Sequence, residues 1–417
     1  MKYYSKLSGL FLLLFFFIVS SCSKDDIEEI DVIEKEVSHT VIVYILGNNN
    51  LHNAALENIN EMETIWREHY KGNLVVVFEP KSRTKEFYMM KIEEDYNPLI
   101  IESPVVKEYY DMDAMDPEDM KSVLSDVVSL YPSDRYSLIL WSHGTGWLPP
   151  YVYPKSFEIT SLPEENIYST DVVQEVSPND ISPRAFGESD YLIMDIHDLC
   201  DAIPSNVFDN IFFDACFMGS IEVLYEMRDK ADYFIASPTE ILSYGFPYHS
   251  VIPIMFSDTI DLTAIGESYM NFYKSLDGEL QSATIGVIAS LQLEGLAQQT
   301  KSLIQNTRQD IKQADFSNVQ YYDGFQHKIY YDLKDAMSAI TPDINLFSKY
   351  NLQFEKAITY SGHTDYFMSE FKINRCSGIS CFLPIDEYNK PLNNYYKSFS
   401  WYKDSGFDIL FDSLNNE

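Results

Sequence analysis

Two residues with complementary chemistry each follow a short apolar stretch. Cys216 comes after Asn210–Asp214, and His143 comes after Tyr136–Trp141 and just before Gly144. A thiol becomes a strong nucleophile beside an imidazole or at a helix N-terminus. Nucleophilic catalysis by the Cys216 thiol beside the His143 imidazole is therefore one interpretation of the pair. Cysteine is also among the most often buried residue types, so a packing role for Cys216 is the alternative.

Strands and helices that alternate along the chain would bring these residues together. Apolar runs with little alternation predict buried strands, and helical spacing of apolar residues predicts the segments between them. The expected strands are 40–46, 74–78, 86–92 (antiparallel to 74–78), 136–141, 210–216, 232–237, 283–290 and 379–384. The expected helices are 51–70, 117–131, 192–203, 218–229, 260–276, 293–304 and a final one within 395–414. We expect an α/β fold with a mostly parallel central sheet flanked by helices, followed by a helix-rich C-terminal portion. His143 and Cys216 would lie at the carboxyl ends of two strands, where open α/β sheets bind ligands.

Glycine beside the histidine suggests how a substrate would be held. Gly144 lets the backbone approach a substrate closely. The N–H groups of Gly144 and Cys216 could then form an oxyanion hole, in which each donor contributes about 3 kcal/mol.

The first residues resemble an export signal. Lys2 and Lys6 precede an apolar run over 10–19 and small residues before Cys22, an arrangement similar to a bacterial lipoprotein signal peptide at 1–21 that leaves Cys22 to be lipidated. A short membrane-spanning anchor is the alternative, but the run is shorter than the roughly 20 residues that a spanning helix needs. Residues 22–38 are expected to be an acidic tether that holds the exported chain at a bacterial membrane.

The charge is strongly negative. The chain has 30 basic and 64 acidic residues, a net charge of −34. Nucleic acid and anionic surfaces should repel such a chain, whereas basic peptides would be attracted. The alternative is that the acidity only keeps the protein soluble.

Neither the spacing of the cysteines nor the cluster of acidic residues indicates a metal site. The chain has five cysteines without CxxC or HExxH spacing, which argues against structural zinc and a disulfide scaffold. The acidic residues at 111–119 lack the glycine and glutamate that an EF-hand loop needs. We expect them to cap a helix that starts with Asp116 and Pro117. No cofactor is expected; calcium is possible but nothing in the sequence indicates it.

Several motifs in order resemble the clostripain family of cysteine peptidases, relatives of caspases, gingipains and legumain. The resemblance extends over residues 39–384 and is specific because the motifs occur in sequence. They are Gly47–Leu51 with Glu61-Met62, His143-Gly144, Tyr191–Met194, Asp214–Gly219 with Glu222, Ala236–Glu240 with Gly245–Tyr248, Asp332-Leu333 and Gly378–Ser380.

The resemblance implies roles for individual residues. His143 and Cys216 would form a catalytic dyad, and Asp214 would lie near the S1 pocket, where family members favour Arg or Lys at P1. A carboxylate suits this purpose because it can bind a guanidinium bidentately. The alternative for Asp214 is a strand-end acid satisfied by backbone N–H groups. Glu240 is a second candidate for the pocket wall, and Trp147 is expected to be a pocket wall or loop anchor.

Self-processing is a further implication of the resemblance. Residues 149–190 are rich in Pro, Ser, Glu and Asp with little periodicity, and we interpret them as a processing loop. Lys155 and Arg184 are the basic residues of this segment, so cleavage is predicted after one of them.

The sequence therefore predicts a caspase-like catalytic domain over 39–290 and a helical C-terminal portion over 291–417. The leading hypothesis is a lipid-anchored extracytoplasmic cysteine endopeptidase that cuts peptides or proteins after basic residues. Two alternatives remain open: a catalytically inactive relative that binds peptides at the surface, and the same dyad with a non-basic P1 preference.

Overall fold

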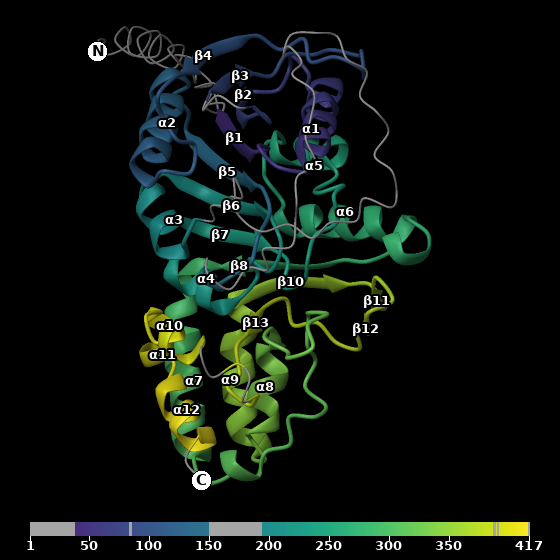
Figure 1. Cartoon of the computed structure of the whole chain (residues 1–417). Coiled ribbons are helices and arrows are strands. Elements are labelled where there is room, and N and C mark those ends of the chain that lie inside the picture. The colour runs from purple at the N-terminus through teal and green to yellow at the C-terminus, as the bar shows by residue number, and fades with distance from the viewer. Residues whose placement is uncertain (1–37, 83–85, 150–193, 387–388, 390–391, 416–417) are drawn as a thin grey trace, which may run out of the picture. The chain divides into compact units, whose positions relative to one another are not determined.

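A large mixed sheet organises the molecule (Figure 1). The computed structural model describes residues 38–82, 86–149, 194–386, 389 and 392–415. Within these residues the main sheet has nine strands in the order β10-β8-β7-β6-β5-β1-β2-β3-β4. Their bounds are β1 (His39–Leu46), β2 (Gly72–Glu79), β3 (Phe87–Lys91), β4 (Val105–Tyr109), β5 (Arg135–Trp141), β6 (Phe208–Asp214), β7 (Ala231–Ala236), β8 (Thr284–Ala289) and β10 (Ile358–His363).

The centre of the sheet is parallel and its edges are antiparallel. Strands β7, β6, β5, β1 and β2 pair in parallel, and β3 pairs antiparallel with β2 as predicted. The apolar runs form the central strands because helices bury both faces of a parallel sheet. The edge strands β4 and β10 were not predicted. Most of β4 is exposed, so its residues lack the apolar pattern that marks a buried strand.

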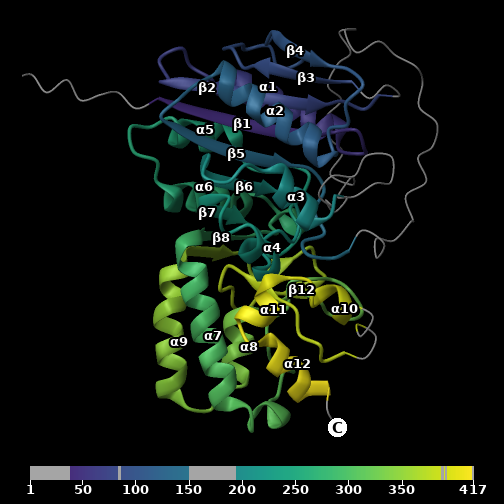
Figure 2. The ribbon, with the colours of Figure 1, turned by 90° about the vertical axis from the view of Figure 1, so that its left-hand side faces the viewer.

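Helices cover both faces of this sheet. Figures 1 and 2 show α1, α5 and α6 on one face and α2, α3 and α4 on the other. Their bounds are α1 (His52–Ile65), α2 (Pro117–Leu130), α3 (Ile196–Ala202), α4 (Ile221–Glu226), α5 (Tyr248–Met255) and α6 (Leu262–Ser275). The predicted cap of α2 is confirmed, because the Asp116 carboxylate accepts hydrogen bonds from Glu118 N and Asp119 N. The arrangement confirms the expected α/β fold class.

The last part of the chain is rich in helices, as expected, and also adds strand β10 to the main sheet. Its helices are α7 (Leu293–Thr307), α8 (Leu333–Ala339), α9 (Ile344–Ala357), α10 (Asn393–Tyr396), α11 (Ser400–Asp404) and α12 (Phe407–Asn415). Its short strands are β9 (Tyr331–Asp332), β11 (Tyr366–Phe367), β12 (Phe371–Lys372) and β13 (Ser380–Cys381), and β13 pairs with β9. All described residues belong to one compact unit, Val37–Glu417. Among the helices of the described residues, none combines the length and apolar character needed to cross a bilayer.

A buried acid joins helix α4 to the C-terminal portion. Glu222 is fully buried, and its Oε1 accepts hydrogen bonds from Phe382 N at 2.9 Å and from the Tyr396 hydroxyl at 2.7 Å. Burial raises the pKa of Glu222 from the ordinary value of 4.5 to about 7, because a low-dielectric environment disfavours the carboxylate. The Glu222 carboxyl group, which ionises near neutral pH, thus links helix α4 to Phe382 and Tyr396 by hydrogen bonds.

We expect Glu222 to make the fold less stable as pH rises. Between pH 4.5 and about 7 the folded chain keeps a proton that the unfolded chain releases, so the free energy of unfolding falls across this window. The loss should approach about 3 kcal/mol at pH 8. Urea unfolding of wild type and Glu222→Gln at pH 5 and pH 8 measures it, and the variant should lose less stability than wild type. An equal fall in the free energy of unfolding in both proteins would contradict the raised pKa of Glu222.

Candidate active site

Two neighbouring strands deliver His143 and Cys216 to the same edge of the sheet. Strands β5 and β6 pair in parallel, and Trp141 lies opposite Asp214 at their carboxyl ends. His143 follows Trp141 by two positions, as Cys216 follows Asp214. The backbone stays paired beyond the strands, because Ser142 N donates to Asp214 O at 3.3 Å. The register therefore brings the two predicted dyad residues to equivalent positions.

Gly144 lies directly against the backbone of Cys216. A β-carbon placed on Gly144 would come within 2.2 Å of Cys216 O and 2.6 Å of Cys216 N. Real β-carbons do not approach other atoms so closely, so only glycine permits this contact. The contact ties the histidine loop to the cysteine loop, and it brings the two residues predicted to supply oxyanion donors against each other.

The imidazole of His143 is oriented by a third strand end. Strand β1 is the neighbour of β5, and Asn50 in the turn after β1 bonds through its Oδ1 to His143 Nε2. An amide oxygen only accepts hydrogen bonds, so this bond places a proton on Nε2 and makes Nδ1 the acceptor of the neutral ring. The His143 side chain is 1% exposed, and the bond fixes its tautomer and its plane.

The thiol of Cys216 is buried at a turn with unusual backbone geometry. Ile241 N donates to Cys216 Sγ at 3.2 Å, and the thiol donates to Ile241 O at 3.7 Å. The next residue, Phe217, has φ of 60°, which is uncommon for a bulky side chain. Because of this turn, helix α4 begins at Ile221, three residues after the predicted start at Met218.

Asp214 is buried beneath the loop that follows β7. Its carboxylate accepts hydrogen bonds from Phe246 N and from the Tyr248 hydroxyl, both at 3.0 Å. Gly245, with φ of 65°, packs so closely that a β-carbon there would lie 2.5 Å from Asp214 Oδ2. These contacts agree with the alternative that the sequence left open for Asp214, an acid at the end of a strand that accepts hydrogen bonds from the backbone. Contact between Asp214 and substrate stays a prediction.

Glu240 lies next to the residue that contacts the nucleophile. It precedes Ile241 in the chain, and its side chain is only partly exposed. The pKa of Glu240 is raised to about 8, mainly by burial and to a smaller extent by the nearby carboxylates of Glu370 and Asp323. Glu370 reaches over the 323–324 turn, where a β-carbon on Gly324 would lie 1.9 Å from Glu370 Oε2. Three carboxyl groups therefore gather beside the loop that holds Cys216.

Trp147 anchors the histidine loop to the C-terminal portion. Its side chain is fully buried, with ring centroids 4.9 Å from Phe382, 5.1 Å from Tyr396 and 6.3 Å from Phe399. The loop-anchor interpretation fits this environment. The burial of Trp147 does not support its predicted contact with substrate.

Some predicted sites lie outside the described residues, namely Cys22, Lys155 and Arg184. Among the described residues no disulfide joins Cys200, Cys216, Cys376 or Cys381. Sequence reasoning included Asn50 in the Gly47–Leu51 motif but gave it no role, although it follows a strand beside β5 and so belongs to the same sheet edge. Sequence reasoning missed Glu370, which comes from a distant segment without a motif of its own.

Comparisons with known proteins identify relatives of this chain. The model of the clostripain family (Peptidase C11) matches residues 43–158 and 175–414. Clostripain from Hathewaya histolytica is 26% identical over 323 residues, which cover 72% of this chain and 54% of that protein. The chain thus spans about half the length of this curated relative.

Solved structures share the fold over most of the chain. An inactive zymogen of a C11 protease from Parabacteroides distasonis is 28% identical, with a TM-score of 0.71 over 90% of this chain and 99% of that one. A secreted C11 cysteine protease from Bacteroides thetaiotaomicron, solved in complex with an irreversible peptide inhibitor, is also 28% identical. Its TM-score is 0.69, over 89% of this chain and 99% of that one.

Proposed function

Because the chain belongs to the clostripain family of cysteine peptidases, we propose that it is a cysteine endopeptidase with Cys216 as nucleophile and His143 as acid and base. The observation that carries the proposal is the contact of Gly144 with the backbone of Cys216. This contact joins the two loops that bear the dyad, and it leaves no room for any other residue at position 144.

The arrangement supports hydrolysis in two steps. His143 takes the thiol proton of Cys216, and the sulfur attacks the carbonyl carbon of the scissile peptide bond. The N–H groups of Gly144 and Cys216 stabilise the negative charge on the carbonyl oxygen. His143 then gives the proton to the leaving amine, which leaves a thioester on Cys216. Water, deprotonated by His143, attacks the thioester and releases the carboxylic acid and the thiol. Asn50 keeps the ring of His143 oriented through both steps.

Basic residues at P1 suit the charge beside the nucleophile. Glu240 precedes Ile241, whose N–H donates to Cys216 Sγ. The carboxyl groups of Glu370 and Asp323 add negative charge near Glu240. Asp323 already pairs with Lys328 at 3.9 Å and accepts from backbone N–H groups, so an arginine or lysine side chain at P1 would pair with Glu240. In this proposal Glu240 contacts the P1 cation, and Asp214 holds the pocket loop at Gly245–Tyr248 in place.

The preference for a basic P1 residue should increase with pH. Because the pKa of Glu240 is about 8, only a minor fraction is ionised at pH 6 and most is ionised at pH 9. The ratio of kcat/KM for a P1-arginine substrate to that for its neutral P1-citrulline analogue cancels the titration of the dyad. We expect this ratio to rise about tenfold from pH 6 to pH 9 in wild type, since a charged hydrogen bond is gained. In Glu240→Gln the ratio should be low and flat.

A fluorogenic panel with P1-Arg, P1-Lys, P1-citrulline and P1-Asn substrates makes this measurement on the full chain. Glu86→Gln, a change of another acid outside the site, serves as the control and should leave the ratio unchanged. Hydrolysis of P1-Asn substrates alone would contradict the basic preference, and hydrolysis of none would contradict the proposed activity.

Export and maturation complete the proposal. The lipoprotein-like signal with Cys22 supports attachment to a bacterial membrane, and the relative from Bacteroides thetaiotaomicron is a secreted protein. Self-cleavage after Lys155 or Arg184 follows from the basic P1 preference, because these are the basic residues of the 149–190 segment.

A further inference from the structure

One buried tyrosine from the C-terminal portion contacts both loops that carry the dyad. The side chain of Tyr330 is fully buried. Its hydroxyl donates to Thr145 O, two residues after His143. Its ring stacks on Phe217, the residue after Cys216, with centroids 4.5 Å apart and planes 9° apart. Tyr330 therefore bridges the histidine loop and the cysteine loop from outside both.

The backbone at these contacts has a geometry that requires support. Phe217 has φ of 60° and Gly146 has φ of 56°, a region that bulky residues rarely adopt. The two turns also touch, because a β-carbon on Gly146 would lie 2.6 Å from Phe217 O and 3.1 Å from the Tyr330 hydroxyl. A disfavoured conformation persists when its surroundings hold it, and the Tyr330 ring is the stacked partner of Phe217.

Tyr330 is itself held in a closed turn. The carboxylate of Asp323 is 1% exposed and accepts hydrogen bonds from Ile329 N and Tyr330 N at 2.9 Å and from Phe325 N at 3.0 Å. Tyr322 N donates to Tyr330 O at 2.8 Å. These bonds fix the position of the Tyr330 backbone independently of the dyad loops.

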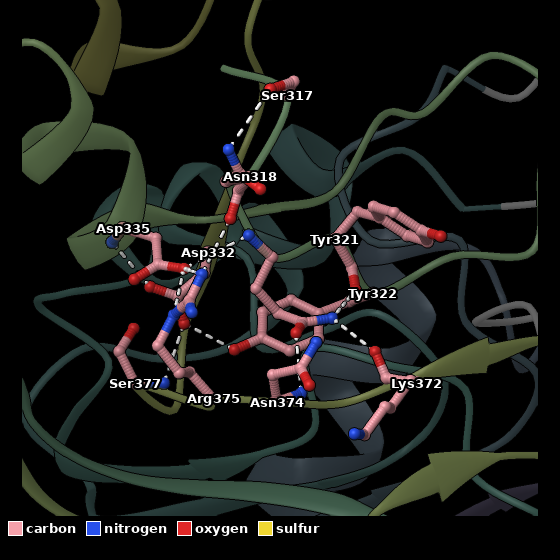
Figure 3. A network of polar contacts seen from close by, with 11 residues as sticks. Ser317, Asn318, Tyr321, Tyr322, Asp332, Asp335, Lys372, Asn374, Arg375 and Ser377 are labelled. Carbon is pink, nitrogen blue, oxygen red and sulfur yellow. Dashed lines mark hydrogen bonds and ion pairs between the residues drawn. The ribbon is translucent and has the colours of Figure 1, made fainter. Parts of the chain in front are cut away.

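A polar network fastens this turn to the rest of the C-terminal portion (Figure 3). Asp332 accepts hydrogen bonds from the Tyr322 hydroxyl at 2.5 Å and from Ser377 N at 2.7 Å. Arg375 contacts Asp335 and Asn318 O at 2.7 Å each. Hydrogen bonds thus join the segments on either side of Tyr330 to Arg375 and Ser377.

We propose that Tyr330 is a positioning residue that sets the alignment of His143 and Cys216 by holding Thr145 and Phe217 together. This inference rests on the proposed peptidase function. The C-terminal portion then forms part of the catalytic apparatus, because it supplies the side chain that spans both loops. A residue that aligns reacting groups affects the chemical step more than substrate binding, so its loss lowers kcat and leaves KM nearly unchanged.

Tyr330→Phe tests this inference, with Tyr44→Phe as the matched control. Both variants lose the hydroxyl of a fully buried tyrosine that donates to a backbone carbonyl, but the Tyr44 hydroxyl bonds Ala114 O instead of a dyad loop. We expect both to lower the melting temperature, whereas only Tyr330→Phe should lower kcat, by about tenfold, with KM within about twofold of wild type. Tyr330→Leu, which also loses the ring stacking, should lower kcat further.

The rate at which iodoacetamide alkylates Cys216 in the full chain gives a second readout without substrate. It should fall in Tyr330→Phe and remain at the wild-type value in Tyr44→Phe. Equal kcat and alkylation rates in the two variants would overturn the positioning role while leaving the peptidase proposal intact. A wild type that hydrolyses no substrate and whose Cys216 reacts no faster than in the urea-unfolded chain would overturn both.

Discussion

Replacing Cys216 with alanine should abolish peptide hydrolysis and leave the fold intact. The thiol is the group that forms the covalent intermediate, and removal of a catalytic nucleophile typically costs a factor of about 10⁴ to 10⁶ in kcat. Alanine fits the buried site, because it removes one sulfur atom and adds no polar group. Circular dichroism and the melting temperature should therefore remain close to wild type, while turnover of the P1-arginine substrate falls to background.

The same variant also separates self-cleavage from cleavage by other proteases. Intact-mass spectrometry should show wild type cut after Lys155 or Arg184 and Cys216→Ala uncut. Cys200→Ala is the matched control, since Cys200 is a half-buried free cysteine on α3, and it should keep both activities. Turnover that survives Cys216→Ala would contradict the mechanism, and equal cleavage of both proteins would contradict self-processing.

Gly144→Ala should lower kcat/KM by about a thousandfold, because displacing a catalytic group by about 1 Å can cost a hundredfold and a misplaced oxyanion donor adds to this loss. The new β-carbon would lie 2.2 Å from Cys216 O, so the histidine and cysteine loops would have to separate. The substitution keeps both side chains of the dyad. A large loss would therefore come from the misalignment of the dyad and of the oxyanion donors.

Gly278→Ala provides the control for this substitution. Gly278 has a positive φ of 62°, and its surroundings leave open space for a β-carbon. The control should lose about 1 kcal/mol of stability from backbone strain and keep wild-type kcat/KM. Wild-type activity in Gly144→Ala would contradict the close contact between the two loops.

The sequence was sufficient to predict that His143 and Cys216 follow two strands, because strand ends are local features. Their role as a dyad was implied by the resemblance to the clostripain family and stays a prediction. Apolar runs ending at Trp141 and Asp214 marked two strands, and the rules of α/β sheets place their carboxyl ends at one edge. The register of β5 and β6 then follows from the pairing of these runs. The capped helix at Asp116 was also predictable, since its signal lies within four residues.

The partners of the dyad could not be predicted, because their contacts depend on the tertiary fold. Asn50 contacts His143 across 93 positions, and Tyr330 contacts Thr145 across 185. Tyr330 has no periodic pattern or spacing rule that marks it, and the Gly47–Leu51 motif that contains Asn50 does not show which residue Asn50 contacts. The turn at Phe217 was missed for a related reason, because its positive φ is supported by stacking on Tyr330 and not by a local glycine.

The role of the C-terminal portion was underestimated for the same physical reason. An edge strand such as β10 gains its pairing from β8, so its own residues need little apolar pattern. Trp147 was identified as a loop anchor or pocket wall, but the aromatic cluster of Phe382, Tyr396 and Phe399 that buries it comes from segments more than 200 residues away.

Covalent labelling tests the central claim, the Cys216–His143 dyad, most directly. The full chain is treated with an irreversible peptide inhibitor that carries lysine or arginine at P1, and peptide mass spectrometry locates the adduct. We expect one adduct per chain, on Cys216, formed rapidly in wild type and about 10³-fold or more slowly in His143→Ala, because the variant lacks the base that activates the thiol. An adduct on another residue, or equal rates on Cys216 in both proteins, would contradict the dyad.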